Sequence, residues 1–440
     1  MRRRATSWVV VTTLLLSLLL VSTIGAAAQA TCTPIATGLN APRFLTVAED
    51  GTVYVTEAGR GGAEPIPTVP GEGPGGPPGT RGMTGQVTRI AAGGAKSVVA
   101  SNLPAYASGP EATGPSGIAI VGGALWVAVG GAGPATPRVT PLPNENSVVR
   151  INPQTGAVDK VADIDAYERA NNPEPFAVDS NLYGLALGAD GMIYVADAGG
   201  NTLYRVNPST GALNVVAVIP GLPVTAAEIP PGLIPPGAPF GNPNRANRPE
   251  LDPVPTGVAT GPDGNIYVAN LSGFPFITGK AKVLRVTSGG ALSDAVTGLT
   301  MAVSVAFGPD GMMYVSQIST SFQLTGPDTP PNVAPGAVVR VMPDGTKQVV
   351  AGDLPTPNGI AFDKAGNLYV VVNSAFGPPG QGQVLRCNAI ATPAQPPMPG
   401  LPSTGAGGTN QSPTVLLALF GAVALFASGL LVARRCSLRG

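Results

Sequence analysis

The chain has no histidine among its 440 residues, and this absence excludes more chemistry than any single motif suggests. Ser-His-Asp hydrolysis needs an imidazole base, so it is excluded, as is any zinc or haem site with a histidine ligand. Only three cysteines are present, Cys32, Cys387 and Cys436, and they are far apart along the chain. No Gly-rich phosphate loop followed by Lys and no dinucleotide fingerprint occurs. What remains is carboxylate and amide chemistry, or binding without chemistry.

Charged side chains are scarce as well. They make up 11% of the residues, and 25 basic side chains balance 25 acidic ones. Nucleic-acid binding draws much of its affinity from Lys and Arg placed against phosphates. We therefore expect no nucleic-acid partner.

One short pattern occurs six times along the chain. Each copy has an apolar run, a tight turn with Gly, a strand with a central aromatic residue, and a later strand ending in Arg and an apolar residue. Turn signals such as Asp190-Gly191 suit hairpins because both residues tolerate positive φ. The aromatic positions that align the copies are Tyr54, Trp126, Tyr194, Tyr267, Tyr314 and Tyr369.

Each copy predicts a small antiparallel sheet. Short β-branched runs between Gly, Pro and Asp are typical of strands, and a fourth strand follows the Arg-containing one, as in residues 97–100. Such a sheet cannot bury both faces alone, so repeated sheets stack against one another. The sequence therefore predicts an all-β fold, a six-bladed β-propeller, over residues 31–388.

The two ends of this domain complement each other. The last blade lacks an outer strand after Cys387, whereas residues 32–39 resemble the segments that precede other blades. We therefore expect the N-terminal strand to close the ring, which would bring Cys32 beside Cys387. A disulfide there would close a very long loop and stabilise the fold by about 4–5 kcal/mol in the chain-entropy model. The alternative is two unrelated free thiols.

The N-terminus predicts export. Three arginines are followed by an apolar run over residues 8–24 and by Ala28-Gln29-Ala30, a small-x-small cleavage site. Residues 1–30 are therefore expected to be a signal peptide that delivers the domain to an oxidising compartment. An uncleaved membrane anchor is the alternative.

The C-terminus predicts a surface anchor. Residues 415–433 are uncharged and apolar, long enough for a transmembrane helix, and the basic tail 434–440 is expected on the cytoplasmic side. Residues 389–414 form a Pro/Gly-rich spacer. Within it Leu401, Pro402, Ser403, Thr404 and Gly405 match an LPxTG sortase signal, with cleavage expected after Thr404. A plain membrane anchor is the alternative, and either one places the domain outside the cell.

Polar residues recur where the second strand of a blade is expected to end. The six positions are Glu57, Val129, Asp197, Asn270, Gln317 and Val372. Because oxygen-only clusters suit a hard cation, we predict a Ca²⁺ site from Glu57, Asp197, Asn270 and Asn181, the last of which precedes a first strand on the same face. Candidate ligand contacts there are Gln317, Asn358 and Asn373. The alternative is that these polar groups only satisfy loop backbones and solvent.

Longer motifs resemble a known family. Residues 56–62, 167–173, 179–185, 196–201 and 271–276 stand in order and together resemble the ScyD/ScyE family, secreted proteins named from the scytonemin pigment gene cluster of cyanobacteria. The resemblance implies an exported, six-bladed NHL-like propeller and supplies no catalytic residues. The anchor tail departs from the family's simple secreted form, which favours surface display over a role in a pigment pathway.

Three functions fit these features. The first is a surface-anchored propeller that binds a small molecule, a glycan or a surface protein at the channel mouth without chemistry. The second is a Ca²⁺-dependent lactone hydrolase or lyase, similar in plan to gluconolactonase and strictosidine-synthase-like propellers, with the metal activating water or polarising a carbonyl. The third is a structural cell-surface protein. We favour the first because it needs only the scaffold, the loops and the tether.

Overall fold

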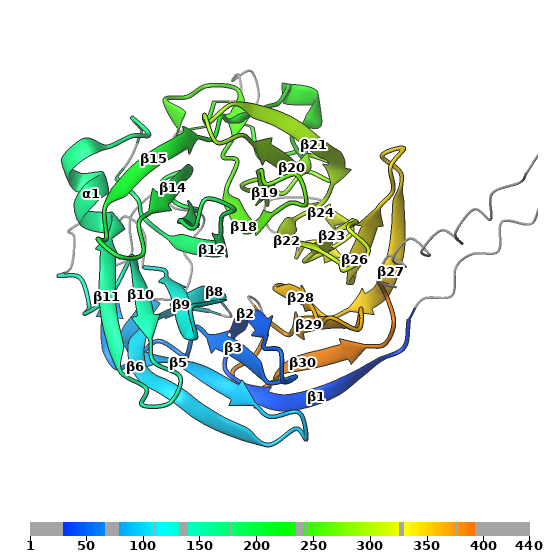
Figure 1. Ribbon diagram of the computed structural model, residues 1–440. Helices are drawn as coiled ribbons and strands as arrows, with labels where there is room; N and C mark the ends of the chain where they lie inside the picture. The colour runs from blue at the N-terminus through cyan, green and yellow to red at the C-terminus, as the bar shows by residue number, and fades with distance from the viewer. Residues whose placement is uncertain are drawn as a thin grey trace, which may run out of the picture. The chain divides into compact units, whose positions relative to one another are not determined.

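Six antiparallel sheets, five of four strands and one of six, stand in a ring in the computed structural model (Figure 1). The structure describes residues 30–66, 79–109, 111–131, 140–176, 178–234, 241–242, 245–324, 330–374 and 377–391. The predicted sortase signal, membrane helix and nearly all of the predicted signal peptide lie outside these residues. Within them, no helix has the length and apolar character needed to cross a membrane. The predicted six-bladed, all-β propeller is confirmed.

The first three blades follow the chain in order, each running from its inner to its outer strand. Blade 1 contains β2 (Pro42–Val47), β3 (Val53–Glu57), β5 (Gly79–Ile90) and β6 (Lys96–Ser108), with β4 (Glu64–Ile66) and β7 (Glu111–Thr113) added. Blade 2 contains β8 (Pro115–Val121), β9 (Ala124–Val129), β10 (Ser147–Ile151) and β11 (Val158–Asp163). Blade 3 contains β12 (Leu182–Leu187), β13 (Ile193–Asp197), β14 (Thr202–Val206) and β15 (Leu213–Val218).

The other three blades repeat this plan, and the last one borrows its outer strand. Blade 4 contains β18 (Pro255–Thr260), β19 (Ile266–Asn270), β20 (Ala281–Val286) and β21 (Leu292–Leu299). Blade 5 contains β22 (Ala302–Phe307), β23 (Met313–Gln317), β26 (Gly336–Val341) and β27 (Lys347–Leu354). Blade 6 contains β28 (Ile360–Phe362), β29 (Leu368–Val372), β30 (Gly382–Cys387) and β1 (Cys32–Leu39).

The ring closes between the two ends of the domain. Strand β1 pairs with β30 in an antiparallel register that sets Cys32 opposite Cys387, and the two sulfurs form a disulfide. Figure 1 shows the blue N-terminal strand lying along the orange last blade. The predicted closure and disulfide are confirmed. Closing the ring in this way pairs the outer edge of β30, which would otherwise be open to another chain.

Connections between blades and within blade 5 hold the remaining short elements. The chain between β11 and β12 forms helix α1 (Ile164–Asn171), which the all-β prediction did not include; Asp163 caps it by accepting from the Ala166 N–H. Two two-stranded antiparallel sheets and one helical turn are also present: β16 (Leu222–Pro223) pairs with β17 (Glu250–Leu251) before blade 4, β24 (Phe322–Gln323) pairs with β25 (Asn332–Val333) between β23 and β26 of blade 5, and η1 is Ala226–Glu228.

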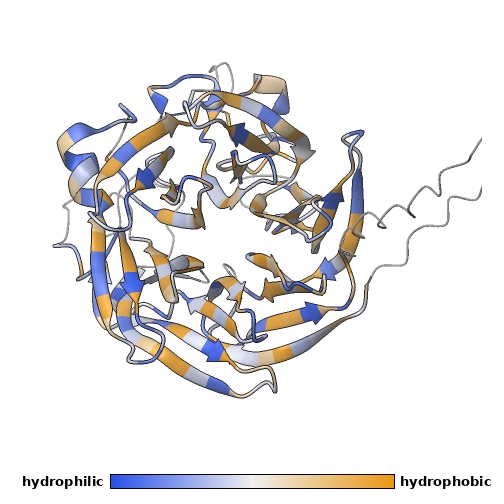
Figure 2. Ribbon diagram, in the orientation of Figure 1, coloured by the Kyte–Doolittle hydropathy of each residue, from blue (hydrophilic) through white to orange (hydrophobic). Residues whose placement is uncertain are grey.

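The hydrophobic core is divided among the interfaces between neighbouring blades. Trp126 and Val148 of blade 2 pack with Val195 and Tyr204 of blade 3, and the other interfaces have similar clusters. Strands are accordingly banded in apolar and polar residues (Figure 2). Full burial of one such aliphatic or aromatic side chain stabilises the fold by about 1.5–3 kcal/mol. Each blade therefore depends on its neighbours, which is why the closure at β1 matters.

The repeated Asp, Tyr and Arg meet within a blade. In blade 5, Asp310 accepts from the Tyr314 hydroxyl at 2.8 Å and from the Met312 N–H at 3.0 Å, and pairs with Arg340 at 2.9 Å. Asp190 and Asp263 make the same three kinds of contact in blades 3 and 4. The turn signal, the aromatic and the Arg of the repeat are thus one hydrogen-bonded unit.

These contacts change the acidity of the turn aspartates. Burial alone would raise the pKa of Asp263, but hydrogen bonds from Asn265, Arg285 and Tyr267 outweigh it and lower the pKa to about 2. A lowered folded-state pKa stabilises the fold above the unfolded value near 4, and this contribution is lost as the pH falls toward 2. Since the Asp263 side chain is 41% exposed, solvent screens much of that gain.

We predict that removing the disulfide weakens the ring more than any single surface contact does. The double variant Cys32→Ser with Cys387→Ser should lose about 4–5 kcal/mol of unfolding free energy, because the unfolded chain is no longer cross-linked across most of the domain. Urea unfolding of this variant against the unmodified chain measures the loss. Reducing agent should lower the stability of the unmodified chain and leave the variant unchanged. Equal stability of the two proteins would contradict the prediction.

Candidate functional site

In three blades, the residue that ends the second strand accepts a hydrogen bond from the backbone just before the inner strand. We call this hydrogen bond the clasp. Glu57 Oε2 accepts from the Asn40 N–H at 2.7 Å, Asp197 Oδ1 from the Asn181 N–H at 2.7 Å, and Gln317 Oε1 from the Thr300 N–H at 2.8 Å. The donor stands two residues before the inner strand in blades 1 and 5 and one residue before it in blade 3. The repeat of polar residues at these positions therefore has a structural cause, whatever else the residues do.

The clasp in blade 3 is reinforced by a second buried acid. Helix α1 carries Glu168, which is fully buried and accepts from the Asp179 N–H at 3.0 Å and from the Ser180 hydroxyl. Burial first, and then the nearby charge of Glu168, raise the pKa of Asp197 well above its usual value. Oδ2 of Asp197 is buried and has no hydrogen-bond partner. Two acids thus hold the segment 179–181 from opposite sides.

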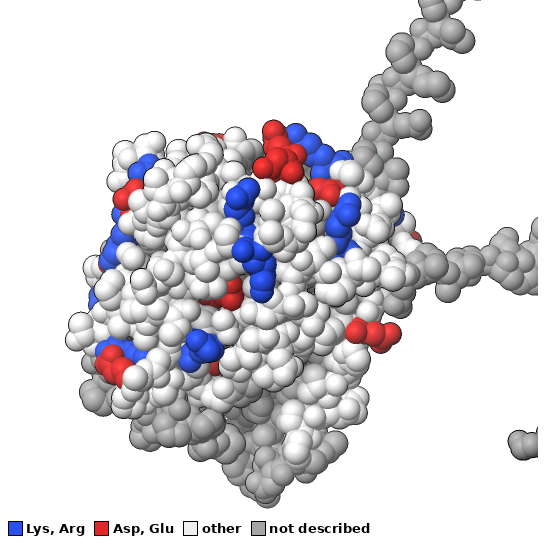
Figure 3. All heavy atoms as spheres, turned by 90° about the horizontal axis from the view of Figure 1, so that it is seen from below, with Lys and Arg blue, Asp and Glu red and all other residues white. Residues whose placement is uncertain are grey.

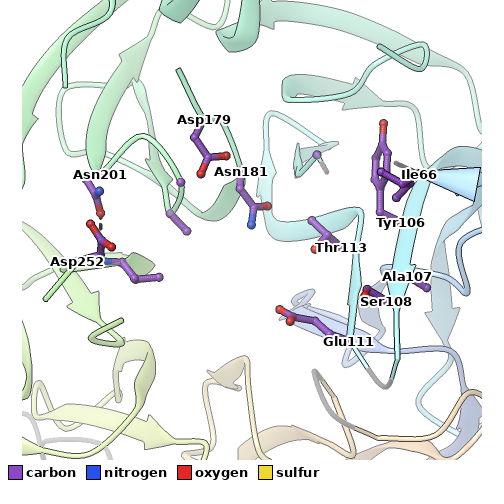
Figure 4. Close-up of a pocket in the computed structure, with 14 residues that line it drawn as sticks. Ile66, Tyr106, Ala107, Ser108, Glu111, Thr113, Asp179, Asn181, Asn201 and Asp252 are labelled. Carbon is purple, nitrogen blue, oxygen red and sulfur yellow. Dashed lines mark hydrogen bonds between the residues drawn. The ribbon is translucent and has the colours of Figure 1, made fainter. Parts of the chain in front are cut away.

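A cavity of about 420 Å³ lies over this segment, at the face where the inner strands begin (Figure 4). Blades 1 to 4 and their connections contribute its walls. Close approach of the backbone shapes it: a Cβ on Gly199 would lie 2.0 Å from the Asp179 carbonyl oxygen, so a side chain there would displace the wall. The lining side chains that carry polar atoms are Tyr106, Ser108, Glu111, Thr113, Asp179, Asn181, Asn201 and Asp252.

Among the described residues, the cavity lining is acidic and includes no Lys or Arg. Glu111, Asp179 and Asp252 supply the carboxylates, and Figure 4 shows Asp179 and Asn181 beside each other, with Glu111 across the opening. Oδ1 of Asn181 is buried without a hydrogen-bond partner, whereas Asn201 accepts from the Val254 N–H at 3.2 Å. The site presents hydrogen-bond acceptors to whatever enters it.

One cavity wall is fixed from behind by a buried ion network. Arg245 is 3% exposed, donates to Glu174 at 2.7 Å and to Glu250 at 2.8 Å, and lies 3.5 Å from Asp252. Its guanidinium also stacks over the Phe176 ring, 4.8 Å from the centroid. Two stretches of the connections before blades 3 and 4 are thereby locked together. The Asp252 carboxylate consequently has a fixed position at the cavity wall.

The residues of the predicted calcium site differ in how far their oxygens are already used. Both carboxylate oxygens of Glu57 accept hydrogen bonds, from Asn40, Gln86 and Thr88. Asp197 and Asn181 lie together and each has one buried oxygen without a partner, and Asn270 in blade 4 has no partner for either polar atom. In the part of the chain that the structure describes, no three Asp, Glu or Cys side chains form a metal cluster. The calcium site stays a prediction.

The three predicted ligand contacts also lie at the start of inner strands or the end of second strands. Gln317 makes the clasp described above, and Asn373 donates through Nδ2 to the Gln381 carbonyl at 3.0 Å. Asn358 is fully buried and donates to the Tyr183 hydroxyl at 2.7 Å. None of these three lines the cavity.

Sequence reasoning missed Glu111, Asn201 and Asp252 of the cavity. Asn201 lies between β13 and β14, and Asp252 lies between β17 and β18. Neither residue stands at the repeated position after the aromatic. Glu111 lies on β7, a strand added to the edge of blade 1 that has no counterpart in the other copies. The one available signal was the length of the connections between blades, because long loops in a compact domain often carry function.

Comparisons with known proteins give only distant likenesses. No family model matches the chain, and a search of curated proteins gave no match. Similar solved structures include virginiamycin B lyase from Staphylococcus aureus, with 13% identity over 82% of this chain and 99% of that one and a TM-score of 0.43. A putative glucose dehydrogenase from Thermus thermophilus has 17% identity, coverage of 81% and 99%, and a TM-score of 0.46. PQQ-bound aldose sugar dehydrogenase from Streptomyces coelicolor has 15% identity, coverage of 83% and 99%, and a TM-score of 0.43.

We predict that Asp197→Asn stabilises the protein at neutral pH. Asn keeps Oδ1 for the two backbone N–H groups that Asp197 holds and replaces the buried Oδ2, which has no hydrogen-bond partner, by a neutral donor. Because burial and the charge of Glu168 raise the folded-state pKa of Asp197, ionising this carboxyl group destabilises the fold. The destabilisation is absent below the unfolded-state pKa near 4 and grows as the pH rises toward the folded-state pKa. Tm at pH 7 should rise by roughly 1–2 °C, the effect of about 1 kcal/mol when unfolding entropy is about 2.1 cal/mol/K per residue over roughly 360 residues.

Thermal unfolding at pH 4 and pH 7, with EDTA and with CaCl₂, checks this prediction. The stabilisation should shrink at pH 4. If CaCl₂ makes the unmodified chain the more stable of the two at pH 7, the predicted calcium site gains support. A lower Tm of the variant at pH 7 in EDTA would contradict the pKa argument.

Proposed function

We propose that this propeller is a binding protein that takes a small, neutral, polyhydroxylated ligand of the sugar class into the cavity at its mouth. The observation that carries the proposal is the composition of that cavity: of the residues that the structure describes, three carboxylates and two amides line it and no basic side chain does. Carboxylate and amide oxygens accept from hydroxyl groups, and charge-assisted bonds of this kind are the stronger ones. An anionic ligand would be repelled.

The volume of the cavity suits a small ligand. A volume of about 420 Å³ falls within the range of about 300–1,000 Å³ usual for small-molecule pockets. Ile66 and Val254 add apolar surface against which the carbon face of a ring can pack. On the face drawn in Figure 3, basic and acidic side chains are few and mixed, so this face favours no strongly charged partner.

A calcium-dependent hydrolase or lyase is the second candidate. The observation in its favour is that Asp197 and Asn181, which lie side by side, each have a buried oxygen without a hydrogen-bond partner. A bound cation would use both oxygens and would explain why an unneutralised acid is tolerated there. If neither a sugar ligand nor a cation binds, the remaining proposal is a structural protein of the cell surface.

We further infer that the propeller is displayed at the cell surface. The Cys32–Cys387 disulfide fits an oxidising compartment, as an exported domain requires. The apolar run, the spacer with its LPxTG-type motif, the apolar segment 415–433 and the basic tail occur in the order that a sorted wall protein needs. The resemblance to the ScyD/ScyE family is compatible with export. Tethering would hold the cavity outside the cell, where soluble glycans are available.

Ligand binding is tested with one substitution inside the cavity and one outside it. Calorimetry of the full chain in detergent against a panel of neutral mono- and oligosaccharides should find at least one ligand. Asn181→Ala should weaken its binding about tenfold or more, because only the side chain is lost and the backbone clasp to Asp197 remains. Asn214→Ala, on the exposed outer strand β15, should bind as the unmodified chain does. If no sugar of the panel binds, the proposed ligand class is wrong.

Anchoring is tested by mass. Protein released from the cell wall by a muralytic enzyme should end at Thr404 if a sortase joins that residue to the wall, and Thr404→Ala should abolish this form. Recovery of chains that retain residues 415–440 in the membrane fraction would instead support the plain membrane anchor.

A further inference from the structure

One buried arginine has no acid to neutralise it. Three arginines in the described part of the chain are almost fully buried, and two of them have carboxylate partners: Arg81 pairs with Glu64, and Arg245 with Glu174. Arg43 is 3% exposed, and its side chain makes one hydrogen bond, from Nη1 to the Tyr183 hydroxyl at 3.1 Å. A guanidinium cannot lose its proton in a protein, so its charge persists after burial.

Arg43 lies where three blades meet across the ring axis. It is the second residue of β2 in blade 1, Tyr183 is the second residue of β12 in blade 3, and Asn358 precedes β28 in blade 6. These strands are the innermost of their blades in Figure 1. Tyr183 accepts from Arg43 and, at 2.7 Å, from Nδ2 of Asn358, although blades 3 and 6 stand on opposite sides of the ring. The three side chains therefore meet on the axis.

The hydrogen bonds of this cluster are incomplete. The Tyr183 oxygen accepts twice, so its own hydrogen has no acceptor among the described residues. Nε and Nη2 of Arg43 form one edge of the guanidinium and have no hydrogen-bond acceptor there. Asn358 Oδ1 is buried without a partner, and turning the amide over would give the phenol an acceptor and leave Nδ2 as a further donor. The cluster has several donors to offer and one positive charge to balance.

We propose that Arg43, Tyr183 and Asn358 form a binding site for a carboxylate ligand on the axis of the propeller. The Nε–Nη2 edge of Arg43 matches the two oxygens of a carboxylate in a bidentate pair, the geometry for which arginine is best suited. The phenol or the amide donates a third hydrogen bond. Phe44 packs edge-on against Tyr183, with centroids 5.6 Å apart, and keeps the ring in place.

The charge and access of the site support this assignment. The guanidinium of Arg43 lies 5.6 Å from the centroid of the Tyr183 ring and has no carboxylate partner among the described residues, so a carboxylate on its free edge would supply the missing counter-charge. Tyr183 is only half-buried, so the cluster is open on one side. The axial site is cationic, whereas the lining of the mouth cavity is acidic, and the residues of the two sites do not overlap. Binding at the axial site can therefore be tested independently of sugar binding in the mouth cavity.

Thermal unfolding of the full chain in detergent tests the proposal, with sodium acetate, sodium phosphate or sodium chloride added at constant ionic strength. Acetate should raise the Tm along a saturating curve, by about 3–6 °C near 100 times its Kd. Arg43→Gln should abolish the acetate response. In buffer without acetate the variant should unfold at the same temperature as the unmodified chain or above it, because it lacks the unpaired charge. The order of the two Tm values should reverse at saturating acetate.

Two further variants keep the test independent of folding defects. Arg43→Lys retains the charge without the planar fork and should bind acetate about tenfold more weakly. Arg285→Gln removes a surface arginine that pairs with Asp263 and should respond to acetate as the unmodified chain does. A saturating response to phosphate but not to acetate would overturn the carboxylate assignment. An acetate response that survives in Arg43→Gln, or its absence from the unmodified chain, would overturn the site.

Discussion

The pairing of β1 with β30 is the constraint on which the rest of the molecule depends. Each blade buries its faces only against its two neighbours, so a ring with one incomplete sheet would expose an edge and leave two interfaces poorly covered. The chain solves this with residues from its two ends and fixes the joint by the Cys32–Cys387 disulfide. Every site described here lies on the inner or upper rim of that closed ring.

Within the ring, the same polar repeat has two different uses. In blades 3, 4 and 5, Asp, Tyr and Arg tie a hairpin turn to the second and third strands, as Asp310, Tyr314 and Arg340 do in blade 5. In blades 1, 3 and 5, the residue that ends the second strand clasps the start of the inner strand. In blade 3 the second use brings Asp197 beside Glu168, and the local surplus of buried acid distinguishes this blade from the others.

The mouth cavity and the axial cluster differ in sign. The cavity gathers carboxylates from blades and connections that surround it, while the axis holds one guanidinium under Tyr183. The acidic cavity favours a neutral ligand with hydroxyl groups, whereas the guanidinium on the axis favours a carboxylate. Their residues are separate, so substitutions can address each without the other.

The sequence by itself determined the number of blades, the turn positions, the ends of the second strands and the disulfide. It could do so because these features repeat: one pattern of apolar, turn and aromatic residues occurs six times, and a missing strand at one end has its counterpart at the other. Helix α1 and the edge strand β7 have no repeat and were not predicted. They bring Glu168 and Glu111 to the site.

Only the tertiary structure decided which polar residues meet. Glu57 looked like Asp197 in the sequence, yet Glu57 is saturated by three donors while Asp197 retains a buried oxygen without a partner. Arg43, Tyr183 and Asn358 are separated by 140 or more residues and come together because equivalent positions of different blades converge on one axis. The physical reason is that the repeat sets the position of a residue within its blade, whereas contacts across the ring depend on closure of the whole circle.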